Sequence, residues 1–424
     1  MHKLLLRVFG ELEQEGFAYC LMRDADRLEQ FAEGGEVDVL VQAGQFAALD
    51  RLLARLGFVR MPDRGYAPHH FFMHYDADSD TWLKLDVVTE VAYGRPVKNL
   101  RTDLAAHCLR HRRRSGPTYA PAPEDELMAL LLHCVLDKGQ IAPHRQERLQ
   151  ALRQEVTDEH YLTALLAAYW SPCRTWPQLA AEIDAEEWAA LLAERSQVID
   201  HLTRRDRRTA RARQIRFRLL RQLNRWSALL RPSVPSVALL GPDGAGKSTL
   251  AEGIQKASLF PASQVYMGLY QKSAKRTPKR LPGIGFMLLL VTQWRRYFTA
   301  RSRQARGQLV IFDRYPYDAL LPSQRRLSWP KRVRRWMLAH ACPPPDLVLV
   351  LDAPAETLYA RKGEHDVDVL ERQREAYLQL QARLPQVSVL DATRDAGQVR
   401  RSATVLIWQA FAHRHNHNHR HSNE

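Results

Sequence analysis

A segment in the second half of the chain has the residue types and spacing of a phosphate-binding loop. It reads GPDGAGKST over residues 241–249, directly after the apolar stretch SVALL and before the helical pattern LAEGIQKA. Glycines allow backbone N–H groups to turn toward phosphate oxygens, and the start of the following helix adds a favourable dipole. The sequence therefore predicts that ATP phosphates bind to Gly241, Asp243, Gly244, Ala245, Gly246, Lys247, Ser248 and Thr249.

Three side chains in and beyond this loop are candidates for the chemistry of phosphoryl transfer. Lys247 is placed to bridge the β and γ phosphates, and the Ser248 hydroxyl is placed to bind Mg²⁺. A second apolar strand, QLVIFD, ends in Asp313, which is the type of acid that reaches the metal from a buried strand. We expect ATP and Mg²⁺ as cofactors, with Ser248 and Asp313 as metal ligands.

The elements around the loop indicate how these residues are positioned. Apolar runs at 346–354 and 386–393 add two further strands to those that precede the loop and contain Asp313, and helical patterns separate them. Strands that alternate with helices favour an α/β fold, a doubly wound parallel sheet with its ligand at the carboxyl ends of the strands.

The same residues resemble the thymidylate kinase family. GPDGAGKST, FDRYPYD, PPDLVLVLDAP and the closing QREAYLQL and VLDAT occur in the family's order, and the resemblance covers about residues 233–412. It implies a nucleoside monophosphate kinase fold that transfers phosphate from ATP·Mg²⁺ to a small acceptor. It also implies that Asp243 faces the sugar of the acceptor, that Arg314 holds the acceptor's phosphate, and that Arg361 is a lid arginine.

The segment that would bind the acceptor departs from this family. Its REPGGT-like sequence is absent, and QVYMGLYQKSAKRTPKR stands there. The basic residues of this segment either bind an anionic substrate or cover a solvated loop: Lys272, Lys275, Arg276, Lys279 and Arg280. Arg295 and Arg296, on the next helix, are weaker candidates for the same site. The identity of the acceptor is left open.

Acidic residues near the amino terminus form a second candidate site. GGEVDVLV at 34–41 and LKLDV at 83–87 resemble the nucleotidyltransferase fold related to polymerase β. In that family, carboxylates on neighbouring strands hold two metal ions. Alternate residues share one face of a strand, so Glu36 and Asp38 could converge with Asp86 on one metal site. The alternative is that these acids are ordinary strand-end residues or relics of a lost site.

The length of the chain and the proline-containing breaks between its patterns suggest several domains. The 424 residues exceed one typical core, and 45% hydrophobic with 26% charged residues is the balance of a globular protein. We expect a small nucleotidyltransferase-like α/β domain at 1–105, a helical region at 106–231, a thymidylate kinase-like domain at 232–412, and a disordered His-rich tail at 413–424. Five scattered cysteines favour a reducing cytoplasm, and no apolar run is long enough to cross a bilayer.

The net charge of +15 is concentrated in places. Eleven arginines lie between 204 and 231, interleaved with apolar residues, which predicts a basic amphipathic helix. Such a helix could lie on an anionic membrane, touch nucleic acid, or pack one face on its neighbour. Nucleic acid is not the expected partner; ATP and a small acceptor are.

Three functions fit these features. The first is a small-molecule kinase that uses the loop and Arg314. The second is a nucleotide-gated ATPase or switch, although the NKxD motif of GTPases and the LSGGQ motif of ABC-type ATPases are both missing from the sequence. The third is a nucleotidyltransferase that uses Glu36, Asp38 and Asp86.

Overall fold

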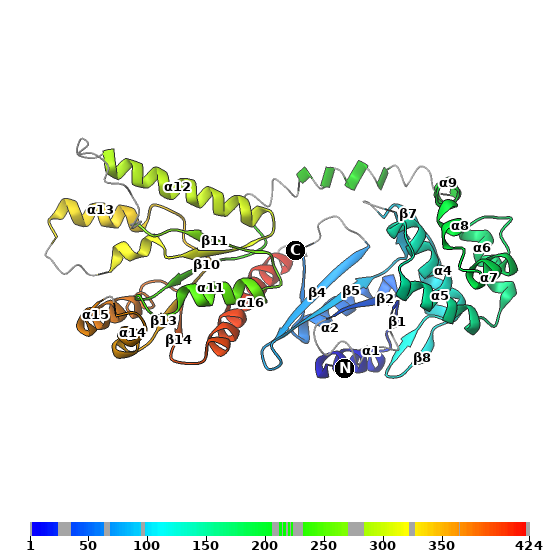
Figure 1. Ribbon diagram of the computed structural model, residues 1–424, viewed down its shortest axis with the longest axis horizontal. Coiled ribbons are helices and arrows are strands. Elements are labelled where there is room, and N and C mark those ends of the chain that lie inside the picture. The colour runs from blue at the N-terminus through cyan, green and yellow to red at the C-terminus, as the bar shows by residue number, and fades with distance from the viewer. Residues whose placement is uncertain are drawn as a thin grey trace. The chain divides into compact units, whose positions relative to one another are not determined.

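The computed structural model divides the chain into two compact units (Figure 1). One unit comprises Met1–Asp76 and Thr81–Leu223, and the other comprises Ala77–Asp80 and Asn224–Glu424. The structure describes residues 2–23, 35–62, 68–94, 98–205, 212–213, 215–217, 219–220, 222–223, 232–269, 284–321, 327–363 and 365–420. None of the helices in these ranges combines the length and the apolar character needed to span a membrane.

The first unit contains a five-stranded sheet of order β1-β2-β5-β4-β3. Its strands are β1 (Tyr19–Leu21), β2 (Glu36–Val41), β3 (Val59–Arg60), β4 (His69–Asp76) and β5 (Thr81–Val88). The neighbours β2 and β5 run parallel, and the other pairs are antiparallel. Helices α1 (Lys3–Gln14) and α2 (Phe46–Arg55) contribute leucines and Phe9 to the core with buried strand residues. In β2, Val37 and Val39 are buried on either side of Asp38, so the acid lies on the opposite face.

The remainder of this unit is mainly helical. It runs through α3 (Leu104–Arg110), α4 (Pro123–Leu132), the π-helical turn η3 (His133–Lys138), α5 (Pro143–Glu155), α6 (Glu159–Tyr169), α7 (Trp176–Asp184), α8 (Trp188–Ala193) and α9 (Arg195–Arg205). One short ladder, β6 (Ala92–Tyr93) with β7 (Leu100–Arg101), precedes α3, and another, β8 (Arg113–Ser115) with β9 (Thr118–Ala120), lies between α3 and α4.

The expected domain boundary near residue 105 does not separate two cores. Cys20, Leu40 and Val88 of the sheet belong to the same buried cluster as the leucines of α4, α5 and α6. The helices therefore complete the hydrophobic core of the sheet, and the sheet and these helices form one compact unit. Nor is 106–231 wholly helical, because the β8–β9 hairpin lies within it.

The second unit contains a five-stranded sheet in which every pair is parallel. Its order is β11-β12-β10-β13-β14, with β10 (Ser236–Leu240), β11 (Ala262–Tyr266), β12 (Leu309–Asp313), β13 (Leu347–Asp352) and β14 (Val387–Asp391). The parallel α/β sheet predicted from the apolar runs is confirmed. The edge strand β11 was not predicted, because only Val265 in its sequence ASQVY is buried and no apolar run marks it.

Helices lie on both faces of this sheet (Figure 1). They are α11 (Lys247–Ala257), α12 (Ile284–Ala305), α13 (Trp329–Ala339), α14 (Ala355–Lys362), α15 (Val367–Leu378) and α16 (Ala396–Arg420), with a 3₁₀ turn η4 at Pro316–Leu320. In the view shown, α12 runs above the sheet, and α11 and α16 run below it. The carboxyl ends of the strands therefore open onto the loops that carry the candidate residues.

Three expectations about the basic and His-rich segments need correction or fall outside the described residues. The tail was expected to be disordered from 413, but α16 continues to Arg420, and the buried His415 hydrogen-bonds through Nε2 to the Ser233 carbonyl at 3.0 Å. This contact anchors the helix end, so the tail does not begin at 413. Most of the arginine-rich segment 204–231 and all of 270–283 lie outside the described residues.

Candidate functional site

The loop between β10 and α11 has a backbone that only glycine adopts easily. Gly241, Gly244 and Gly246 have φ angles of +138°, +90° and +88°. A Cβ atom added at Gly241 would lie 2.7 Å from the Leu351 carbonyl oxygen, and one added at Gly244 would lie 2.7 Å from the Leu358 carbonyl oxygen. The two close approaches fit the loop against β13 and α14. The glycine spacing is therefore explained by backbone geometry as well as by ligand chemistry.

Lys247 is the first residue of α11, and its side chain folds back over the loop. It is only 9% exposed, and its ammonium donates to the carbonyl oxygens of Gly241 at 2.8 Å and Pro242 at 2.7 Å. Burial lowers the pKa of Lys247 to about 8, although the nearby negative charge of Asp243 opposes the shift. Ser248 and Thr249 are exposed in the first turn of the helix. The loop thus presents a buried cation and exposed hydroxyls at one helix start.

Arg314 links the end of β12 to the loop. Its guanidinium forms an ion pair with the Asp243 carboxylate at 2.7 Å, and its other nitrogen lies 3.9 Å from Asp318. Burial raises the pKa of Asp243, but the positive charges of Arg314 and Lys247 outweigh it and hold the pKa below its usual value. Arg314 has a φ angle of +63°, which is uncommon for a residue with a side chain. A strained backbone at such a position is typical of functional sites.

Two residues of this arrangement had no role assigned from the sequence. Asp318 lies four residues after Arg314, and its carboxylate accepts a hydrogen bond from the Tyr377 hydroxyl at 3.0 Å. Burial raises the pKa of Asp318. The signal that could have found it is the motif itself, since Asp318 ends FDRYPYD in the sequence. Tyr377 comes from α15 and carries no local signal.

The other predicted residues of this unit lie at neighbouring strand and helix ends. Asp313 ends β12, where it is in register with Leu239 of β10, and its negative charge is among those that act on Lys247. Arg361 lies in the last turn of α14 and donates to the Ala392 carbonyl at 3.1 Å. Among the residues that the structure describes, neither Asp313 nor Arg361 hydrogen-bonds to the loop.

The acidic residues of the first unit converge. The parallel register of β2 and β5 places Asp38 opposite Asp86, and Glu36 opposite Lys84. One carboxylate oxygen from each of Glu36, Asp38 and Asp86 lies within 4.8 Å of the other two. We call Glu36, Asp38 and Asp86 the acid triad. Asp38 and Asp86 are far apart in the sequence, and they become neighbours because β2 and β5 pair directly.

Each carboxylate of the acid triad has one basic partner. Lys84 contacts Glu36 at 2.7 Å, Arg23 lies 3.4 Å from Asp38, and His69 Nδ1 lies 2.9 Å from Asp86. Burial raises the pKa of Asp38 to about 6, and the charges of Asp86 and Glu36 add to this shift while Arg23 opposes it. Carboxylates crowded in this way fit a divalent cation, which would relieve their repulsion.

Comparisons with known proteins add little to this geometry. No protein-family model matches the chain, and no curated protein matches it. Among solved structures, a thymidylate kinase from Candida albicans is similar, with 19% sequence identity and a TM-score of 0.34 over 42% of this chain and 93% of that chain. A TM-score of this size does not establish a common fold, so the chemistry rests on the residues of this chain.

Proposed function

We propose that the second unit is an ATP-dependent kinase that transfers the γ-phosphate to a small anionic acceptor, in the manner that its motifs share with thymidylate kinases. The observation that carries the proposal is the ion pair of Arg314 with Asp243 inside the glycine loop, at 2.7 Å. A loop that only binds a nucleotide does not need an arginine from the end of β12, the strand that pairs with β10. An arginine at this position supplies a positive charge where an acceptor's phosphate would meet the γ-phosphate.

The residues of the chain divide the work of the reaction. Backbone N–H groups of the loop would hold the phosphates, and the Lys247 ammonium would exchange its two loop carbonyls for β and γ phosphate oxygens. The Ser248 hydroxyl and the Asp313 carboxylate would hold Mg²⁺, which when bound neutralises charge on the phosphates. Their oxygen donors suit this ion.

The acceptor would be oriented by the other side of the loop. Arg314 would bind the acceptor's phosphate or carboxylate through bidentate hydrogen bonds, while Asp243 and Asp318 keep the guanidinium in place. Arg361 would neutralise charge on the transferring group after a movement of its side chain away from the Ala392 carbonyl. Since transfer occurs directly between bound molecules, positioning supplies most of the rate enhancement.

Transfer of labelled phosphate tests this proposal. The native chain is incubated with γ-labelled ATP and Mg²⁺ and with nucleoside monophosphates, nucleosides and sugar phosphates in turn. We expect one acceptor class to be labelled, and the Lys247→Ala variant to label none. Lys256→Ala is the matched control, because Lys256 is exposed on the same helix and should leave transfer unchanged. Release of free phosphate alone, with no labelled acceptor, would favour a nucleotide-gated switch.

The convergence of the acid triad favours a second activity in the first unit. Three carboxylates within 4.8 Å on paired strands suit the binding of divalent cations for nucleotidyl transfer. The chain would then join two nucleotide chemistries. The test is release of pyrophosphate from nucleoside triphosphates in the presence of Mg²⁺ or Mn²⁺, which Asp38→Asn should abolish and Lys247→Ala should leave intact. Pyrophosphate release that survives Asp38→Asn would contradict this assignment.

A further inference from the structure

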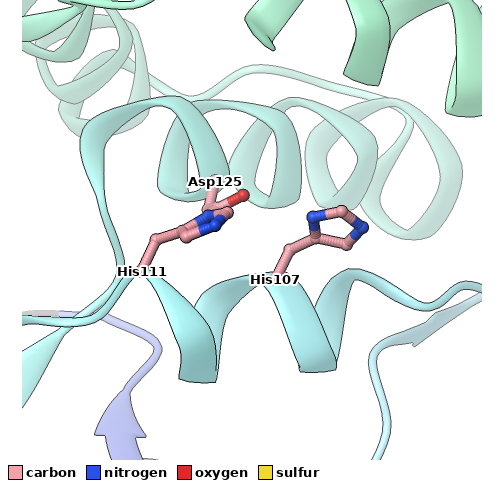
Figure 2. Close-up of side chains that lie close together, drawn as sticks. All are labelled: His107, His111 and Asp125. Atoms are coloured by element: carbon pink, nitrogen blue, oxygen red, sulfur yellow. The ribbon is translucent and has the colours of Figure 1, made fainter.

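A cluster of two histidines and an aspartate lies in the first unit, away from the acid triad in the sequence. His107 is on α3, and His111 follows at its end, four residues later, so both side chains project from the same side of the helix. Asp125 lies in the first turn of α4. Figure 2 shows the His111 ring beside the Asp125 carboxylate, with the His107 ring on the same side of α3 and further along the helix. One ligand atom of each residue lies within 4.8 Å of the other two.

Hydrogen bonds link the three side chains through one tyrosine. His111 Nδ1 lies 3.1 Å from Asp125 Oδ2, and the Tyr161 hydroxyl, from α6, donates to Asp125 Oδ1 at 2.6 Å. The same hydroxyl lies 2.8 Å from His107 Nδ1. The protons of these hydrogen bonds therefore lie between the same nitrogen and oxygen atoms that could bind a metal ion.

The charge of Asp125 is the unusual feature of the cluster. Its side chain is fully buried at 0% exposure, whereas that of His111 is 36% exposed. Across the ranges that the structure covers, no lysine or arginine forms an ion pair with Asp125. A buried carboxylate is stabilised by hydrogen bonds and by a positive partner. A metal cation held beside Asp125 would supply that positive charge.

We propose that His107, His111 and Asp125 bind one Zn²⁺ ion. Two imidazoles and one carboxylate are a common ligand set for zinc, and a water molecule fills the fourth position. Zinc–ligand bonds of about 2.0–2.1 Å place donor atoms about 3.4 Å apart, so small rotations of side chains already within reach complete the site. The ion replaces the shared protons, which leave to solvent past the exposed edge of His111.

The site joins the end of α3 to the start of α4, which the β8–β9 hairpin separates in the sequence. His107 lies in the last turn of α3, His111 directly follows this helix, and Asp125 lies in the first turn of α4. An ion here ties these two helices together and stabilises the folded state by mass action. This inference does not depend on the proposed kinase activity, because its residues belong to the other unit.

Zinc content and zinc-dependent stability test the proposal on the full-length chain. Chelator-treated protein is dialysed against Zn²⁺, and bound zinc is measured by mass spectrometry together with the melting temperature. We expect the native chain to bind one more zinc ion than His107→Gln or His111→Gln. We also expect Zn²⁺ to raise the melting temperature of the native chain but not that of either variant. Loss of a ligand should weaken zinc affinity by at least about tenfold, since even residues behind a ligand cost about 10–100-fold.

Two controls separate this site from other zinc-binding groups. The acid triad and the tail histidines are present in every protein compared, so they cancel from the difference. His144→Gln is the matched control, because His144 is exposed on α5 of the same unit and should behave as the native chain. His111→Cys should restore binding, because a thiolate is also a zinc ligand.

Equal zinc content and equal thermal response in the native chain and the folded glutamine variants would overturn the proposal. Circular dichroism establishes that each variant is folded. If a variant is unfolded, the native chain alone provides the test. A melting temperature of the native chain that Zn²⁺ does not raise would contradict the proposal.

Discussion

The glycine loop and the acid triad are two ways to build the sites that we propose for phosphate chemistry. The loop is made of consecutive residues, and the groups proposed to bind phosphate are mostly backbone N–H groups set by glycines with positive φ angles. The acid triad is made of side chains from two strands that are distant in sequence and adjacent in the sheet. A contiguous site depends on backbone conformation, whereas a converging site depends on strand pairing and on the balance of charge.

The largest expected effect is on the backbone of the loop. Gly244→Ala places a Cβ atom 2.7 Å from the Leu358 carbonyl oxygen, at a φ angle of +90°. We expect ATP affinity to fall by about 100-fold or more, because strain of about 1–3 kcal/mol adds to the lost alignment of N–H groups. Isothermal titration with ATP measures it. Gly285→Ala, which meets no atom within 4 Å, is the control, and an unchanged affinity in Gly244→Ala would contradict the account.

The next effect separates acceptor binding from ATP binding within the second unit. Arg314→Ala removes the guanidinium that pairs with Asp243 and approaches Asp318. Loss of a charged hydrogen-bonding partner costs about 1.5–3 kcal/mol, or about 10–100-fold in the acceptor's KM. Steady-state kinetics should show a much smaller change in the KM for ATP. A matching rise in both constants would assign Arg314 to the loop's structure instead of to the acceptor.

Asp137, a buried carboxylate of the first unit, provides a comparison for the crowded acid triad. Asp137 is 2% exposed and contacts Lys98, His133 at 3.0 Å and the Gly94 N–H at 2.8 Å. Burial raises the pKa of Asp137, but the hydrogen bonds from His133 and Lys98 outweigh it and lower the pKa to about 2. Asp137 is thus already satisfied without a metal ion.

The lowered pKa of Asp137 fixes the direction of its effect on stability. A carboxyl group whose pKa is lower in the folded state stabilises the fold fully above its unfolded pKa of about 4, and this contribution is lost as the pH falls toward 2. Asp137→Asn should therefore lower the free energy of unfolding by about 2 kcal/mol at pH 7 and by much less near pH 2. Urea denaturation over this range measures it. Asp200→Asn, at an exposed position of α9, is the control and should change the free energy of unfolding little.

The smallest effect concerns the acid triad itself. Asp38→Asn removes one of the three converging carboxylates. We expect Mn²⁺ to raise the melting temperature of the native chain by a few degrees, about 2–4 °C, and to have no such effect on the variant. Thermal denaturation with and without chelator measures this. Equal stabilisation of both proteins would place the cation elsewhere.

The sequence predicted those features that depend on local patterns. Apolar runs located four of the five strands in the second sheet, and the glycine spacing located the loop. It missed β11, because an edge strand buries little and needs no apolar run. It also divided the first unit near residue 105, because nothing in a linear pattern shows that the leucines of α4 to α6 cover the same core as Leu40 and Val88.

Features that depend on tertiary contacts were predicted unevenly. Alternation along β2 suggested that Glu36 and Asp38 share a face, and the pairing of β2 with β5 brings Asp86 to them. The contacts of Asp137 with Lys98, and of His111 with Asp125, join residues 39 and 14 positions apart and had no such pattern. The four-residue spacing of His107 and His111 was the one available signal for the proposed zinc site.

Transfer from γ-labelled ATP, compared between the native chain, Lys247→Ala and Asp38→Asn, tests the central claim most directly. The account predicts that the native chain and Asp38→Asn label the same acceptor at similar rates, while Lys247→Ala labels none. Labelled acceptor produced by Lys247→Ala, or transfer abolished by Asp38→Asn, would contradict the assignment of the kinase reaction to the loop of the second unit.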